Sequence, residues 1–417
     1  LFALIKIYMI RILLGLLLFP MFSTAQKTTI DKVKIYLDCS WRCDDDFLQR
    51  EMPYVDYYKD PKSANLHIII NGEESSNGGE IINFRFIGLE GFKNVNNTLL
   101  LDLPPNTSED TERKLYLDIL SKGVYAYVIK TSDNEIASVL YSKKEIIKEK
   151  EEKDKWNSWV FRASVGGYTN GEEGYYNSRY NGRLTINRIT AESKFTSSFS
   201  ASSNVSKFEY EDFSLVTEKK SKYANMTYVK SKGEHFSIGA KANYSQSTSQ
   251  NYDGNYKFSP CIEYNLFPYS ESSEHRLSLL YGVSANHNDY TDTTVYFKIT
   301  ENFASHLFEL TYDNSQTWGS LSFTLMGNQI LDKNDLQKYN LRVSSSIDWN
   351  IARGLSLNYW AYINFDRAQI HLPLEGATYE EIILRQKELE SNYFYYMNFG
   401  ISYTFGSMKN NVVNPRF

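Results

Sequence analysis

The clearest pattern in this chain is an alternation of apolar and polar residues that runs through its last two thirds. It is strongest between Ser391 and Gly406, where the even positions from Asn398 to Thr404 are small or polar. The odd positions are all apolar or aromatic: Tyr393, Tyr395, Met397, Phe399, Ile401, Tyr403 and Phe405. A period of two places the two sets on opposite faces of a β-strand. One apolar and one polar face are what a membrane-spanning β-barrel requires, because lipid touches its outside and water its inside.

Segments with the same alternation recur in pairs from Trp156 onward. We expect about twelve strands, near residues 159–169, 178–190, 193–207, 217–231, 235–249, 256–268, 275–288, 305–314, 318–330, 337–351, 355–370 and 391–406. The connections alternate between short turns, such as 190–192, 232–234 and 352–354, and long loops, such as 170–177, 208–216, 289–304 and 370–390. Bacterial barrels have even strand numbers, with short turns in the periplasm and long loops outside. An even count also returns both ends of the barrel to the periplasm.

A secreted β-sandwich is the competing prediction, because its strands alternate too. Two features favour the barrel: many strands reach ten residues or more, and aromatic residues gather at strand ends. The mean hydropathy is only −0.46 although the chain has 33 Tyr and 24 Phe. A barrel gives this combination, since only every second residue faces lipid. We expect its closing strand, 391–406, to pair with the strand beginning at Trp159.

Residues 28–141 have a different pattern, typical of a small α/β domain. Strands are expected at 33–38, 66–70, 81–87 and 98–103, with a helix starting at Asp44 and another after Ser108. That order predicts a small sheet with helices on one face. The charged run 143–155 that follows is interpreted as part of a linker, 142–156, with a partner-binding helix as the alternative. The barrel then occupies 157–406, and a polar tail 407–417.

The first 25 residues read as a secretory signal peptide, with Lys6 and Arg11 before the apolar run 12–19 and small residues at 23–25. An uncleaved membrane helix is the alternative, but the run is short for a span. Cleavage removes two positive charges and no acids, which takes the net charge from −5 to −7. That balance gives no reason to expect nucleic-acid binding.

Charged residues within the predicted strands fall on the polar face. We predict that they line the lumen as pore residues: Arg162, Arg183, Lys241, Glu263, Glu309, Arg342 and Asp348. A charge on the lipid face would cost about 2–4 kcal/mol near the midplane, which supports this assignment. The residues either select solutes in an open pore or pair across the lumen and fill it.

Other candidate chemistry is sparse. Cys39 and Cys43 predict a local disulfide in an oxidising compartment, whereas a metal site would need further ligands and His67 is the only histidine of that domain. Cys261 is expected to be a free thiol facing the lumen. We identify no phosphate loop, cofactor site, metal site or catalytic residues, and an enzyme is the least favoured class.

Several motifs carry a resemblance to a known group. They are F-G-I-S-Y-T-F-G (399–406), the tail N-V-V-N-P-R-F (411–417), I-Y-L-D-C (35–39) and E-M-P-Y-V-D-Y-Y-K-D-P-K-S-A-N-L-H-I-I-I (51–70). With them the chain resembles bacterial outer-membrane β-barrel proteins that carry an N-terminal periplasmic α/β domain. The resemblance implies location and architecture, because that group has no assigned activity. The chain departs from barrels in general by its polar tail after Phe405, since the last strand commonly resembles the signal for the barrel assembly machinery.

The sequence therefore predicts a mainly β protein of the Gram-negative outer membrane, with its N-terminal domain in the periplasm. The favoured function is a channel or small-solute transporter whose α/β domain docks a periplasmic protein. The alternatives are a non-conducting barrel for envelope structure, adhesion or assembly, and a lipid-processing enzyme. The expected partners are outer-membrane lipid, the barrel assembly machinery and a periplasmic protein.

Overall fold

The computed structural model describes residues 32–39, 43–75, 79–105, 107–131, 155–190, 192–210, 213–272, 274–332, 338–376, 391–406 and 409. The predicted signal peptide (1–25), most of the predicted linker (142–156), most of the expected loop 370–390 and most of the predicted tail (407–417) lie outside the described residues. No helix in these ranges is long and apolar enough to cross a membrane.

The N-terminal region is a five-stranded sheet in the order β2-β1-β3-β4-β5, with two α-helices. Its strands are β1 (Lys34–Asp38), β2 (Asp56–Tyr57), β3 (Leu66–Glu74), β4 (Glu80–Gly88) and β5 (Asn96–Leu103). The helices are α2 (Asp45–Glu51) and α3 (Glu109–Val128). The predicted α/β class is confirmed, although the sequence pattern missed β2, which has only two residues.

The two helices begin where the sequence predicts because side chains cap them. The carboxylate of Asp44 accepts a hydrogen bond from the Phe47 backbone N–H, and the hydroxyl of Ser108 accepts one from Thr111. Apolar residues on one face of the sheet pack against the helices. Ile68, Ile82 and Phe84 are fully buried there with Leu120 and Val124 of α3.

The rest of the chain forms a twelve-stranded antiparallel sheet in sequence order from β6 to β17, which confirms the predicted class and number of strands. The strands are β6 (Trp159–Glu172), β7 (Tyr175–Ile189), β8 (Ser193–Tyr210), β9 (Phe213–Lys232), β10 (Phe236–Ser247), β11 (Tyr252–Asn265), β12 (His275–Tyr290), β13 (Thr300–Gln316), β14 (Gly319–Ile330), β15 (Tyr339–Ala352), β16 (Leu355–Asp366) and β17 (Tyr393–Tyr403).

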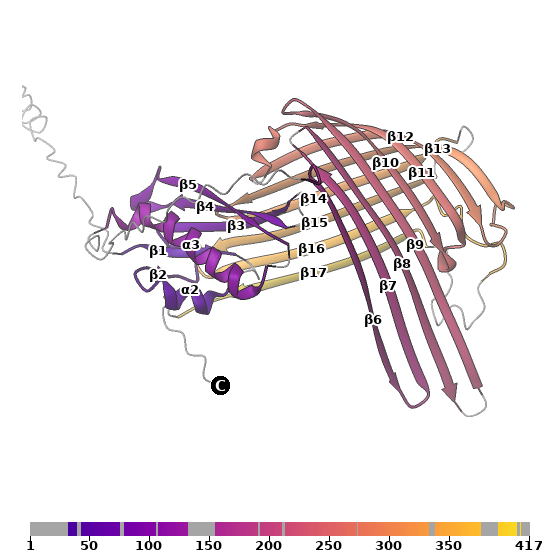
Figure 1. The fold of residues 1–417 in the computed structure, drawn as a ribbon, viewed down its shortest axis with the longest axis horizontal. Coiled ribbons are helices and arrows are strands. Elements are labelled where there is room, and N and C mark those ends of the chain that lie inside the picture. The colour runs from indigo at the N-terminus through magenta and orange to yellow at the C-terminus, as the bar shows by residue number, and fades with distance from the viewer. Residues whose placement is uncertain are drawn as a thin grey trace, which may run out of the picture.

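The two ends of this sheet differ in their connections. Short turns join β7 to β8, β9 to β10, β13 to β14 and β15 to β16, and Gly233 and Gly354 have positive φ angles in two of them. At the opposite end the connections from β12 to β13 and from β16 to β17 are long, as expected. The long loops expected at 170–177 and 208–216 are wrong, because β6 to β9 extend through most of these positions. We call these the short-turn end and the long-loop end. The α/β region lies against the short-turn ends of the later strands (Figure 1).

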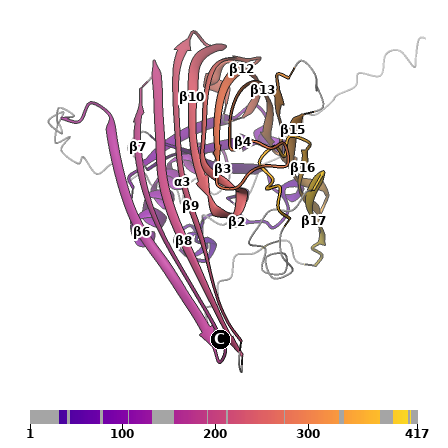
Figure 2. The same ribbon diagram turned by 90° about the vertical axis from the view of Figure 1, so that its right-hand side faces the viewer.

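The sheet curves in a wide arc, and its two edge strands, β6 and β17, lie apart on opposite sides of the sheet in Figure 2. No pairing joins β6 to β17 among the described residues, so the expected partnership of the last strand with the strand at Trp159 is not formed in this structure. The described strands establish the sheet, its order and its register, and leave its two edges unpaired.

Candidate functional site: the inner face of the sheet and its two ends

The twelve-stranded sheet has a mainly apolar outer face and a mainly polar inner face, although the register places Lys222 and Lys230 of β9 on the outer face. Strand β12 shows this residue by residue, because Leu279, Tyr281 and Val283 are exposed whereas Ser278 and Ser284 between them are buried. A water-soluble protein has the opposite arrangement. We call the face that carries Ser278 and Ser284 the inner face.

All seven charged residues predicted for the lumen lie on the inner face, because paired residues of antiparallel strands share a face. Register pairs connect Glu263 to Leu280, Leu280 to Glu309, Glu309 to Met326 and Met326 to Arg342, and the same alternation reaches Asp348. Pairs across β6 to β10 place the other three, Arg162, Arg183 and Lys241, on that face as well.

Two of the seven meet in an ion pair. The Nζ atom of Lys241 lies 3.3 Å from an Oε atom of Glu309, and both side chains are partly buried. Their strands, β10 and β13, are three positions apart, about 14 Å along a flat sheet. The contact therefore requires tight curvature. Lys257 reaches across in the same way, donating to Asn328 at 2.7 Å.

The other five lie apart from this pair. Glu263 accepts a hydrogen bond of 2.9 Å from the Tyr269 hydroxyl at the short-turn end. Arg162, Arg183 and Arg342 are exposed. Asp348 is also exposed and lies at the short-turn end, where it lines a cavity described below.

Polar side chains occupy the buried part of the inner face. The hydroxyls of Ser259 and Ser284 are 2.7 Å apart, and Asn286 donates to the hydroxyl of Ser305 at 3.0 Å. All four residues are buried. Hydrogen bonding offsets the cost of removing such groups from water. Strands β11 to β13 thus carry a buried, hydrogen-bonded layer of polar side chains on the inner face.

The α/β region covers the short-turn end with the helix-free face of its own sheet. On β3 and β4, the residues between the core positions point away from the helices, among them His67 and Arg85. His67 is 0% exposed and Arg85 3% exposed although no helix covers them. Contacts with the large sheet account for part of this burial.

Arg85 makes the first of these contacts. Its guanidinium donates a hydrogen bond of 2.7 Å to the backbone carbonyl of Ser315, at the end of β13. It also lies 3.4 Å from the carboxylate of Glu274, just before β12. Burial lowers the pKa of Arg85, and the negative charge of Glu274 partly offsets this effect.

Asp60 and Lys62 contact the turn between β15 and β16. The carboxylate of Asp60, which is 2% exposed, accepts a hydrogen bond of 3.1 Å from the Gly354 backbone N–H. Lys62 donates to the Ile351 carbonyl at 2.6 Å. In addition, Lys409 pairs with Asp56 at 2.8 Å and forms a β-bridge with Tyr58. The α/β region is thus held at three separate places.

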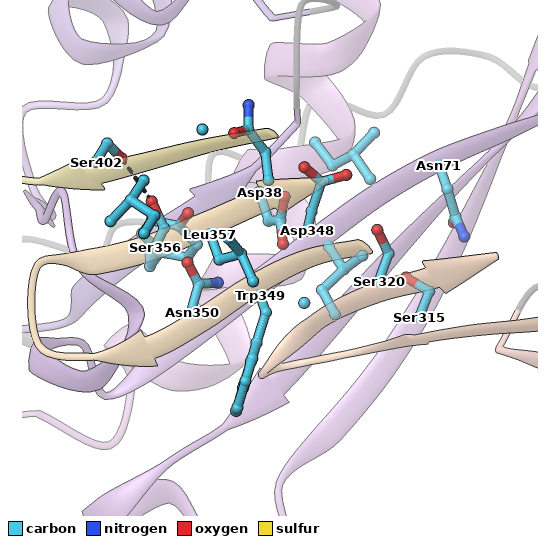
Figure 3. A pocket seen from close by; sticks show the side chains of 17 residues that line it. Asp38, Asn71, Ser315, Ser320, Asp348, Trp349, Asn350, Ser356, Leu357 and Ser402 are labelled. Carbon is cyan, nitrogen blue, oxygen red and sulfur yellow. Dashed lines mark hydrogen bonds between the residues drawn. The ribbon is translucent and has the colours of Figure 1, made fainter. Parts of the chain in front are cut away.

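A cavity of about 700 Å³ lies between the α/β region and the large sheet. Figure 3 shows its polar lining, with Asp38 from β1 and Asp348 from β15 as the two charged side chains. Hydroxyl and amide groups surround them: Asn71, Ser315, Ser320, Asn350, Ser356, Asn358 and Ser402.

At the long-loop end, two connections are joined across the strands. Residues after β16 meet those after β12, since Val295 donates its N–H to Leu372 at 2.9 Å and Leu374 donates to Thr293 at 2.7 Å. The side chain of Asn251 ties the two segments together, donating to the carbonyls of Asp292 and His371. We call residues 370–374 the strap.

The predicted cysteine chemistry can also be located. Cys39 and Cys43 form a disulfide with their Cα atoms 5.8 Å apart, between β1 and α2. Cys261 is a free cysteine on the inner face of β11. The described residues hold no group of three His, Cys, Asp or Glu side chains that could bind a metal ion.

Sequence reasoning missed Arg85, Asp60 and the strap. Arg85 gave one signal, because it stands between Phe84 and Phe86 in a strand whose alternate residues are apolar. A charge there indicates that the second face of the strand meets a polar surface or water. Which surface it meets cannot be read from the strand itself.

Comparisons with known proteins add little to this description. No protein-family model matches the chain, and no curated protein matches it in sequence. Among solved structures, it is similar to a NanC porin at 8% identity and a TM-score of 0.26, over 58% of this chain and 99% of that one. It is also similar to the translocator domain of the autotransporter NalP from Neisseria meningitidis at 12% identity and a TM-score of 0.19, over 59% and 81%. At these TM-scores neither likeness bears on function.

Proposed function

We propose that this chain is a β-barrel protein of the bacterial outer membrane that conducts small solutes through a lumen covered by its own α/β domain. One observation carries the proposal: the outer face of the twelve-stranded sheet is mainly apolar and its inner face is mainly polar. Lipid is the solvent that makes this arrangement stable.

A membrane setting also supports closure of the sheet. The free edges of β6 and β17 carry backbone N–H and C=O groups without a ladder partner, and each such group costs several kcal/mol in hydrocarbon. With twelve antiparallel strands, β6 and β17 run in opposite directions, as antiparallel closure requires. We propose that these two edges pair when the protein is in a bilayer.

The position of the α/β region supports a periplasmic orientation for the short-turn end. Short turns face the periplasm in bacterial barrels, and the contacts of Arg85 and Asp60 are made with that end. The covering face is therefore occupied by the barrel itself. A periplasmic partner protein would have to dock on the helical side of the domain.

The decisive experiment is planar-bilayer recording of the full-length protein, preceded by gel mobility of unheated and boiled samples. We expect a heat-dependent mobility shift and discrete conductance steps. Unchanged mobility would argue against the barrel. A protein that shifts on heating but never conducts would support the barrel fold and contradict the channel function.

A non-conducting envelope barrel is the second candidate, and the ion pair of Lys241 and Glu309 favours it. If the pair holds a filled lumen together, Glu309→Gln should weaken the fold without changing conductance. If the two residues bound a pore, the same substitution should change the ratio of cation to anion permeability.

A further inference from the structure

We propose that the cavity between the α/β domain and the barrel is a binding site for an uncharged, hydroxylated solute of mono- to disaccharide size. The inference rests on the proposed function insofar as the cavity lies where a solute would pass the short-turn end. It adds the chemical class of that solute.

The cavity has the size of a small-molecule binding site. Its volume of about 700 Å³ falls within the range of roughly 300–1,000 Å³ that small-molecule sites occupy. Its walls come from β1 and β3 of the domain and from β13 to β17 of the barrel. The site is therefore complete only when the domain is in place.

The lining then selects among ligand classes. Among the described residues the lining contains two carboxylates, three amide side chains and four serine hydroxyls, and no lysine or arginine. The two carboxylates disfavour an anion, and the guanidinium of Arg85 beside the cavity is buried and already bonded to the Ser315 carbonyl. Carboxylates accept and amides both donate and accept, which matches the adjacent hydroxyl groups of a sugar or polyol.

Two observations bear on the competing class, an inorganic cation. No three acidic, histidine or cysteine side chains converge among the described residues, so a transition-metal ion would lack its usual ligand set. In addition, the Asp38 carboxylate lies 3.3 Å from Nε2 of His67. This contact orients the carboxylate and uses one of its hydrogen-bond acceptor sites. Nδ1 of His67 is buried without a hydrogen-bond partner.

Most of the polar groups remain available to a ligand. Asp38 retains 33% exposure of its side chain, and Asp348 and Asn358 are exposed. Ser356 and Ser402 bond to each other at 2.7 Å, and each hydroxyl can make a further hydrogen bond. Figure 3 shows the ring of Trp349 directed away from the two carboxylates, so polar groups rather than a ring face form this part of the site.

The test is isothermal titration calorimetry of the full-length protein with maltose, with spermidine and glucose 6-phosphate as cationic and anionic probes. The detergent must be an amine oxide, because a glycoside detergent presents the same headgroup chemistry. We expect maltose to bind and the charged probes not to bind. Asp348→Asn should weaken maltose binding roughly 10- to 100-fold, as expected for the loss of a hydrogen bond to a charged group.

A matched control is Asp102→Asn, which makes the same change on an exposed position of β5 that does not line the cavity. Its maltose affinity should equal that of the wild type. Binding of spermidine but not maltose, or maltose binding that Asp348→Asn leaves unchanged, would overturn the inference. Conductance without maltose binding would overturn the sugar site and support the channel. Maltose binding without conductance would support the sugar site and overturn the channel.

Discussion

At the residue scale, a few buried polar groups hold the α/β domain against the large sheet. Arg85 is the clearest case, since its guanidinium leaves water to contact a carbonyl and a carboxylate of another part of the chain. Breaking such a contact leaves a buried charge without compensation, which costs more than the contact contributes when formed.

We predict that Arg85→Met weakens attachment of the α/β domain to the barrel by about 1.5–3 kcal/mol, the worth of a hydrogen bond from a charged group. Cleavage of the lysine-rich run 143–155 by trypsin would separate the two parts of the chain. Only non-covalent contacts, including those of Lys409 in the tail, would then hold the domain. Size-exclusion chromatography of the cut protein measures how much of the domain remains bound.

The matched control is Arg113→Met on α3, where the guanidinium pairs with Asp110 and Asp44 of the same domain. We expect the cut domain to stay bound in this variant. Equal retention of the domain in both variants would show that Arg85 does not hold it.

Tyr127 gives a prediction for alkaline pH. Its buried hydroxyl donates to the carbonyls of Phe86 and Val95, and burial raises its pKa to about 12. In the unfolded chain the pKa is about 10, so between pH 10 and 12 the folded state holds a proton that the unfolded state has lost. The stabilisation is complete below pH 10 and falls as pH rises toward 12, by roughly 1.4 kcal/mol for each unit of pKa difference.

Urea unfolding followed by the helical circular dichroism signal at several pH values measures this slope, because α2 and α3 both lie in the domain. Tyr127→Phe is the control and should have a shallower slope in the same window. An identical slope in the two proteins would assign the loss of stability to other groups.

At the scale of the single strand, sidedness is the property to test. On β15, Val343 lies on the outer face and its neighbour Ser344 on the inner face. We predict that Val343→Arg destabilises the folded barrel in lipid vesicles by about 2–4 kcal/mol, whereas Ser344→Arg costs much less.

The fraction of heat-modifiable protein across a urea series measures both variants under the same conditions. The two substitutions add the same side chain at adjacent positions, so only the face differs. Equal loss of folded protein would contradict the assignment of faces and with it the membrane setting.

At the scale of the whole molecule, the α/β domain covers the short-turn end of the sheet, so the proposed channel should depend on where the domain sits. The β-bridge between Tyr58 and Lys409 brings two backbone segments to a separation that suits a disulfide. We predict that the double variant Tyr58→Cys with Lys409→Cys holds the domain in place and lowers conductance, and that a reductant restores it. Wild type treated with the same reductant is the control, because the disulfide of Cys39 and Cys43 is also exposed to it.

Much of the architecture could be predicted from the sequence because it depends on local patterns. Alternation with a period of two fixed the strands and assigned each side chain to a face, so that Glu309 and Asp348 could be placed on the inner face without a structure. The caps at Asp44 and Ser108 located the helices in the same way, since a cap involves residues three positions apart.

The tertiary structure alone decided what lies across from what. Arg85 and Ser315 are 230 residues apart, and Lys241 and Glu309 are 68 residues apart, so no periodicity links them. Lys241 reaches Glu309 because the sheet curves. The cavity at Asp38 and Asp348 exists because the α/β sheet docks on the end of the large sheet. The sequence determined which face each group would occupy, because facing is a property of a single strand. Contacts between faces depend on how the strands curve and pack, which only the folded chain specifies.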